Sequence, residues 1–192
     1  LVLSSGLPDQ GTCARWQLAL ATSSAEAATG IYDRYEAAVK LLPGEDDGAA
    51  FDRVKRRLLA YDVFPPRVLR FVLCPAGPLT LWTVVVQRVA FGRVTLESVV
   101  RVVDVWDTAS DSERRVGFRY VTLAGHPERG VAAFSVSQDG AGIHVVAESR
   151  SEPGTCRTPR NEATDDRVME PPLRRPDKVR IVPLFFLPVS AG

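Results

Sequence analysis

A short segment in the second half of the chain concentrates the residues that could do chemistry. Tyr120 and Thr122 stand two positions apart, and His126 and Glu128 follow them across a glycine- and proline-containing turn. An imidazole beside a carboxylate or a phenol can transfer protons, so His126 with Glu128 or Tyr120 is a candidate general acid or base. The competing interpretation is a turn histidine that bonds its own backbone, and we favour it.

The strand expected before this turn offers a second kind of chemistry. Phe118, Tyr120 and Thr122 alternate with other residues, so all three side chains share one face of a strand. An apolar wall with two hydroxyl groups suits a small hydrophobic or amphiphilic ligand, because binding pockets are mostly apolar with a few placed polar groups. Plain core packing is an equally good interpretation of this face.

The remaining polar candidates are weaker. Arg150 follows a serine and could hold a carboxylate or phosphate of a ligand, although such an arginine more often closes a structural salt bridge. His144 lies in an apolar run and fits a hydrogen-bonded sheet histidine better than a ligand. The 2 histidines and 3 scattered cysteines match no metal-ligand spacing. Because hydrolase and nucleotide motifs are also absent, the sequence predicts neither a metal site nor a cofactor.

Composition and charge exclude several classes of protein. The 192 residues are 45% hydrophobic and 24% charged, which is typical of one folded domain. A net charge of +1 draws no nucleic acid, and the basic cluster around residues 53–57 is best interpreted as a solvated helix face. Apolar stretches fall short of the roughly 20 residues of a membrane span. We therefore expect a soluble, cytoplasmic protein whose separated cysteines are free thiols.

Two helices are expected near the N-terminus. Residues 23–26 fit a capping box, and apolar residues at helical spacing extend the predicted helix over residues 23–42. A second helix is predicted over residues 49–60, with apolar residues on its inner face. Pro65 and Pro66 lie just beyond it and cannot continue a helix.

After these prolines the pattern changes to strands. Segments rich in Val, Phe, Thr and Tyr are separated by short turns, which favours antiparallel hairpins. They cover residues 67–74, 81–91, 94–106, 115–123, 131–137 and 143–149. The expected fold class is α+β, with the N-terminal helices packed on a curved antiparallel sheet of about six strands, near the usual sheet size.

The predicted helices and strands divide the chain into three parts. Residues 1–22 are a leader with a possible edge strand at residues 15–21, and residues 23–150 form a single α+β domain. Prolines interrupt the charged stretch that follows, so residues 151–192 are predicted to be a proline-rich loop or divergent tail. The apolar end, residues 179–189, is interpreted as an edge strand or as a tail outside the fold.

The candidate segment also resembles a known family signature. Residues 117–130 are similar to the Gly-Phe-x-Tyr-Gly-Thr-Leu-x-Gly-His-Pro-Glu run of the uncharacterised DUF1990 family, and the likeness extends over residues 46–152. Val121 stands where the family has glycine, and Val131 and Ala132 replace an acidic pair. The resemblance implies no activity. Its order of helices and strands is loosely similar to that of helix-grip lipid-binding folds, by analogy only.

Three functions remain open. The leading prediction is a small hydrophobic or amphiphilic ligand held between sheet and helices near Tyr120, Thr122 and His126, with Phe118 and Arg150 contributing. It requires a cavity of about a few hundred Å3, the usual pocket size. The alternatives are an enzyme whose His126 faces that cavity, and a structural or regulatory interaction protein with an exposed apolar patch.

Overall fold

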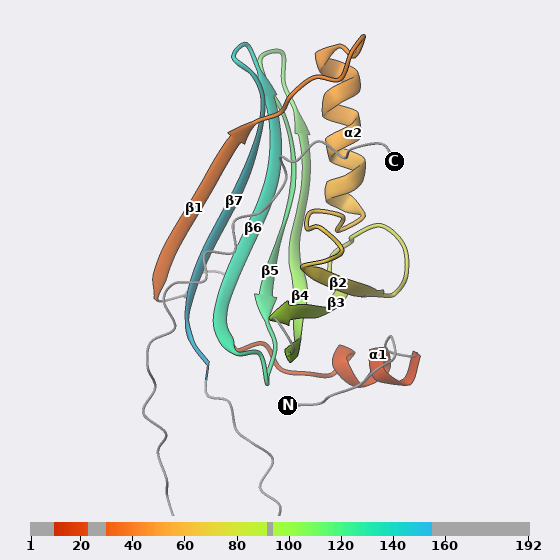
Figure 1. Ribbon diagram of the computed structural model, residues 1–192, viewed down its shortest axis with the longest axis vertical. Coiled ribbons are helices and arrows are strands. Elements are labelled where there is room, and N and C mark those ends of the chain that lie inside the picture. The colour runs from red at the N-terminus through yellow and green to blue at the C-terminus, as the bar shows by residue number, and fades with distance from the viewer. Residues whose placement is uncertain (1–9, 23–29, 92–93, 155–192) are drawn as a thin grey trace, which may run out of the picture.

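A computed structural model describes residues 10–22, 30–91 and 94–154 of the chain, and a seven-stranded antiparallel sheet dominates it (Figure 1). The helices are α1 (Gln10–Gln17) and α2 (Asp47–Leu59). The strands are β1 (Ile31–Ala38), β2 (Leu69–Cys74), β3 (Val84–Phe91), β4 (Val94–Ala109), β5 (Arg114–Thr122), β6 (Glu128–Asp139) and β7 (Gly142–Pro153).

The strand order follows the chain except at one edge. Strands β2 to β7 pair with their sequence neighbours, whereas β1 adds to the far edge beside β7, so the order is β1-β7-β6-β5-β4-β3-β2. Figure 1 shows the sheet curving, with α2 along its inner side. Because the strands form one curved layer with α2 against its inner face, this face holds both the main core and the space that α2 does not fill.

Helix α2 is specified by its ends and by its inner face. The side chain of Asp46 accepts a hydrogen bond from the Ala49 N–H at 2.8 Å, which caps the first turn. Phe51, Val54 and Leu58 are buried against the sheet, mainly against β6 and β5. These residues recur at helical spacing, so the helix predicted over residues 49–60 is confirmed.

The opposite face of the sheet carries a smaller apolar cluster under α1. Arg101 donates hydrogen bonds to three carbonyl oxygens at the end of α1, including that of Gln17 at 2.8 Å. Cys13 is joined to Cys74 by a disulfide, with the two Cα atoms 5.5 Å apart. The expectation of free thiols is therefore wrong for these two cysteines, while Cys156 lies outside the described residues.

The helix expected over residues 23–42 is wrong. Its capping box lies outside the described residues, and residues 31–38 form β1, which pairs along its whole length with β7. The spacing of apolar residues there matches a helix, but Ile31, Tyr32 and Tyr35 also favour strands. The open edge of β7 supplies partners for their backbone groups, so the tertiary pairing overrides the local period.

Because of this difference, the expected α+β fold class is also wrong. The N-terminal helices and the sheet of about six strands, on which the analogy with helix-grip folds depended, are replaced by a predominantly β structure with seven strands. Each of the six predicted strand segments does overlap an observed strand. The possible strand at residues 15–21 is instead the end of α1 followed by a single bridge between Ala21 and Leu123.

The division into three parts stays a prediction, since most of residues 151–192 lies outside the described residues. No helix in the described part of the chain is long and apolar enough to cross a membrane.

Candidate functional site

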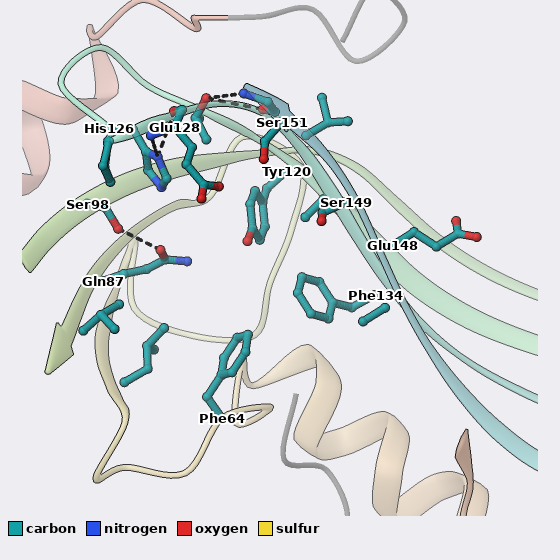
Figure 2. A pocket seen from close by; sticks show the side chains of 18 of the residues that line it. Phe64, Gln87, Ser98, Tyr120, His126, Glu128, Phe134, Glu148, Ser149 and Ser151 are labelled. Atoms are coloured by element: carbon teal, nitrogen blue, oxygen red, sulfur yellow. Dashed lines mark hydrogen bonds between the residues drawn. The ribbon is translucent and has the colours of Figure 1, made fainter. Parts of the chain in front are cut away.

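A cavity of about 520 Å3 lies on the inner face of the sheet, beyond the end of α2 (Figure 2). All seven strands contribute to its wall, and the loop after α2 adds Phe64 and Val68. The wall is mainly apolar. Its apolar side chains are Tyr35, Phe64, Val68, Leu69, Val89, Leu96, Val131, Ala132, Phe134 and Ala147, together with Pro127.

Buried polar groups from separate elements meet at one side of the cavity. Ser98 on β4 donates a hydrogen bond to the Gln87 side-chain oxygen on β3 at 3.0 Å, and the Gln87 amide donates to the Tyr61 hydroxyl. Gln87 and Ser98 are directly paired across the two strands. Their side chains hold one another in place, so the polar groups of this wall are preorganised before anything binds.

Tyr120 projects from β5 into the same region (Figure 2). Burial raises the pKa of its phenol to about 12, while a hydrogen bond with Gln87 acts in the opposite direction and the charge of Glu128 raises the pKa further. The hydroxyl therefore keeps its proton at neutral pH. It offers the cavity a neutral group that can donate or accept one hydrogen bond.

The turn between β5 and β6 forms the rim. Thr122 Oγ1 accepts a hydrogen bond from the Gly130 N–H at 3.0 Å and lies 2.6 Å from Thr22 Oγ1. Gly125 has φ +91°, a backbone conformation that side chains resist. The threonine thus clamps the two strands together where they leave the sheet, and its hydroxyl is already used by its neighbours.

His126 is held by backbone atoms of this turn. Its Nδ1 lies 3.0 Å from the Glu128 N–H and 2.9 Å from the Glu128 carbonyl oxygen. In either tautomer Nδ1 is used by the backbone, so the ring offers one nitrogen, Nε2, to the cavity. This geometry matches the interpretation of a histidine that stabilises its own turn.

Burial lowers the pKa of His126 to about 4, and its backbone hydrogen bond opposes that shift only partly. The imidazole is therefore neutral at neutral pH. A general acid or base works best when its pKa lies near the operating pH. The environment of His126 favours a fixed hydrogen-bonding role over proton transfer.

The family model of a domain of unknown function, DUF1990, matches residues 19–161. The chain belongs to the DUF1990 family. The match includes all seven strands and every residue of the cavity wall.

Comparison with solved structures and curated proteins adds little. This DUF1990 chain is similar to the crystal structure of a hypothetical protein from Helicobacter pylori, with 15% identity and a TM-score of 0.44 over 65% of this chain and 71% of that one. A likeness this distant supports no argument. No curated protein matches the chain.

The structure separates the predicted site residues of this DUF1990 domain into two groups. Tyr120, Thr122, His126 and Glu128 line the cavity. Phe118 is fully buried in the core. Arg150 is exposed, and its guanidinium lies 5.6 Å from the centroid of the Tyr32 ring on β1.

Sequence reasoning missed Gln87 and Ser98 as site residues. A weak signal existed for Gln87, which is a lone amide after the apolar run Val84, Val85 and Val86. A polar residue in a buried strand needs a partner, so such a position points to a network or a site. No group of three or more His, Cys, Asp or Glu side chains within the described ranges could hold a metal ion.

The lowered pKa of His126 predicts a pH dependence of stability. Below about pH 6.5 the His126 imidazole is protonated in the unfolded chain but stays neutral in the folded one. The free energy of unfolding therefore falls as the pH drops from about 6.5 to about 4. His126→Asn should remove this part of the pH dependence. NMR titration of the ring, assigned with that variant, should give a midpoint near 4. A midpoint at or above the ordinary value of 6.5 would contradict the burial.

Proposed function

We propose that this DUF1990 domain binds a small hydrophobic or amphiphilic molecule in the cavity between the sheet, the end of α2 and the loop after it. The observation that carries the proposal is a cavity of about 520 Å3 whose apolar wall surrounds a few converging polar groups. Ligand sites are commonly of this size and character. The neighbouring space on the same face of the sheet is filled by a packed core, so the cavity is a local feature of the fold.

The polar groups give the proposed ligand an orientation. Gln87, Ser98, Tyr120 and His126 lie toward one side of a mainly apolar wall, as Figure 2 shows. An apolar body would contact Phe64 and Phe134, and a polar end would form hydrogen bonds with the hydroxyl and imidazole groups. This arrangement supports an amphiphile over a wholly apolar molecule.

The test is binding of a neutral, environment-sensitive dye such as Nile red, followed by its fluorescence. We expect saturable binding at a 1:1 ratio. Ala132→Trp fills the cavity from β6 and should weaken binding by at least about tenfold, equivalent to 1.4 kcal/mol. The neighbouring Ala133→Trp places the same side chain on the opposite face of the sheet and should leave binding unchanged.

Two results would contradict the proposal. One is the absence of saturable dye binding to the folded protein. The other is equal binding by Ala132→Trp and Ala133→Trp, because the dye would then occupy a surface that the cavity does not include. Circular dichroism of both variants shows whether the sheet has remained intact.

A further inference from the structure

The cavity carries no basic side chain within the part of the chain that the structure describes, although the whole sequence contains 24 lysines and arginines. Two glutamates, Glu128 and Glu148, are among its wall residues. Pockets for carboxylates or phosphates usually contain arginine or lysine, which supply charge and donors together. The described wall therefore lacks the positively charged side chains that usually bind an anionic ligand.

The two glutamates have different surroundings. The Glu148 carboxylate accepts a hydrogen bond from the Tyr32 hydroxyl at 3.1 Å and lies 3.4 Å from the Arg34 guanidinium. Figure 2 shows its side chain directed away from the cavity. Its charge is thus partly offset by Arg34, which also pairs with Glu36 at 2.6 Å.

Glu128 lies at the exposed rim of the inner face, at the start of β6. It has the same parity in β6 as the buried Ala132 and Phe134, so its side chain leaves the strand on the cavity side. Figure 2 shows its carboxylate between His126 and Tyr120. Its charge contributes to the raised pKa of Tyr120, which agrees with this closeness. Because neither neighbour is positively charged at neutral pH, the polar side of the cavity carries a net negative charge.

We infer that the molecule bound here has a hydrogen-bond donor at its polar end, an amine or a hydroxyl, and that carboxylates and phosphates are excluded. The inference rests on the proposed function and names its ligand class. The donor would bind the Glu128 carboxylate, with Tyr120 and Ser98 completing its shell. For an ammonium group, the aromatic rings in the wall add favourable cation–π contacts.

Electrostatics sets the direction of this selectivity. A carboxylate or phosphate placed beside Glu128 would meet a like charge, which solvent screens in part because Glu128 is exposed at the rim, and the described wall has no cation to offset it. An ammonium group in the same place forms a charge-assisted hydrogen bond with the Glu128 carboxylate, which favours binding. We therefore expect an amine to bind more tightly than an acid of equal length.

The experiment compares dodecylamine, dodecanol and dodecanoate as competitors for Nile red at neutral pH, each below its micelle concentration or solubility limit. The three share one hydrocarbon chain and differ in the polar end. We expect the amine and the alcohol to displace the dye at concentrations at least about tenfold lower than the acid. Glu128→Gln should weaken the binding of dodecylamine by about tenfold and strengthen the binding of dodecanoate. The difference between their competing concentrations should therefore become smaller. Glu113→Gln, in the exposed β4–β5 turn, is the matched control and should change neither.

The outcomes separate this inference from the proposed function. If Nile red and dodecanol bind but dodecanoate competes as well as dodecylamine, or if Glu128→Gln leaves their ratio unchanged, the ligand class is wrong and the cavity still binds. If neither Nile red nor any of the three competitors binds in a saturable way, the proposed function itself fails.

Discussion

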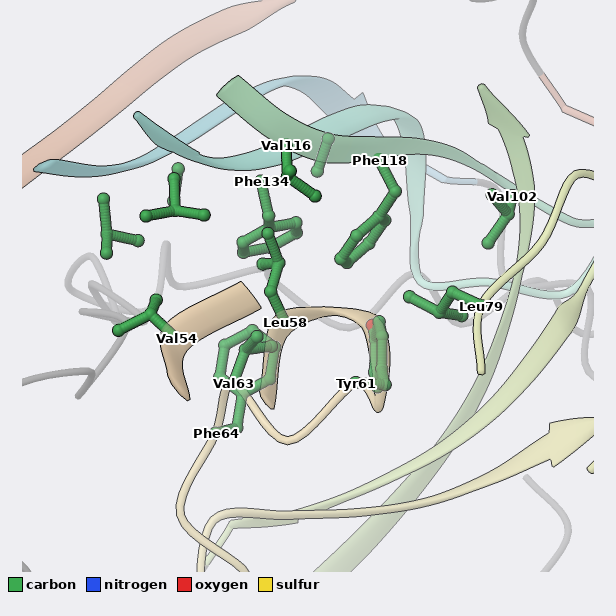
Figure 3. Close-up of a cluster of buried hydrophobic side chains, with 14 of the residues drawn as sticks. Val54, Leu58, Tyr61, Val63, Phe64, Leu79, Val102, Val116, Phe118 and Phe134 are labelled. Carbon is green, nitrogen blue, oxygen red and sulfur yellow. The ribbon is translucent and has the colours of Figure 1, made fainter. Parts of the chain in front are cut away.

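Phe118→Ala should lower the free energy of unfolding by about 3–5 kcal/mol, as is typical when a buried aromatic ring is deleted. Phe118 has no exposed surface. Its ring centroid lies 5.4 Å from that of Phe134 and 5.7 Å from that of Tyr61, and Figure 3 shows it over the end of α2. The strand and the helix on either side are fixed by their own hydrogen bonds, so the space left by the ring cannot close fully.

Urea denaturation of the variant and the parent protein measures this loss. Tyr32→Ala is the matched control, because Tyr32 is also an aromatic residue on a strand but is 51% exposed. Its removal should change the free energy of unfolding by about 0.5 kcal/mol or less. A loss below about 1 kcal/mol for Phe118→Ala would show that the ring is not part of a packed core.

Gly130→Ala should lower the free energy of unfolding by about 2–3 kcal/mol through overpacking. A Cβ atom at this position would lie 2.3 Å from the Arg150 carbonyl oxygen and 2.7 Å from the Ser151 Cα, both in the backbone of β7. Backbone atoms cannot rotate aside as a side chain can. The methyl group would therefore push β6 away from β7 and disturb the hydrogen bond that the Gly130 N–H donates to Thr122.

Gly140→Ala is the control for this prediction. Gly140 follows the other end of β6, and a Cβ atom there would have nothing within 4 Å. Thermal unfolding of the two variants should show a lower melting temperature for Gly130→Ala alone. Equal melting temperatures would mean that the β6–β7 contact is looser than the structure has it.

The sequence predicted the strands from β2 to β7 because each has β-branched or aromatic residues bounded by short turns. It failed at β1, where the apolar spacing fits a helix and the deciding partner, β7, lies far along the chain. Local patterns carry information about local structure, and a strand at a sheet edge is chosen by its neighbour. The fold class was missed for that one reason.

The candidate site was predictable where it is continuous in sequence. Tyr120, Thr122 and His126 stand within seven residues, and strand alternation followed by a turn is enough to bring them to one end of the sheet. Gln87 and Ser98 come together only through the register between β3 and β4. That register depends on the packing of the whole sheet, so spacing along the chain could not reveal their contact.

The edge position of β1 also has a consequence for the order of events during synthesis. Ile31 pairs with Ser151, so β1 leaves the ribosome first but has no partner strand until β7, the last strand, has been synthesised. Contacts this distant in sequence form late, because the long intervening loop must close first. Tyr35 brings β1 to the cavity wall, so the nascent chain has no complete cavity until β7 has emerged.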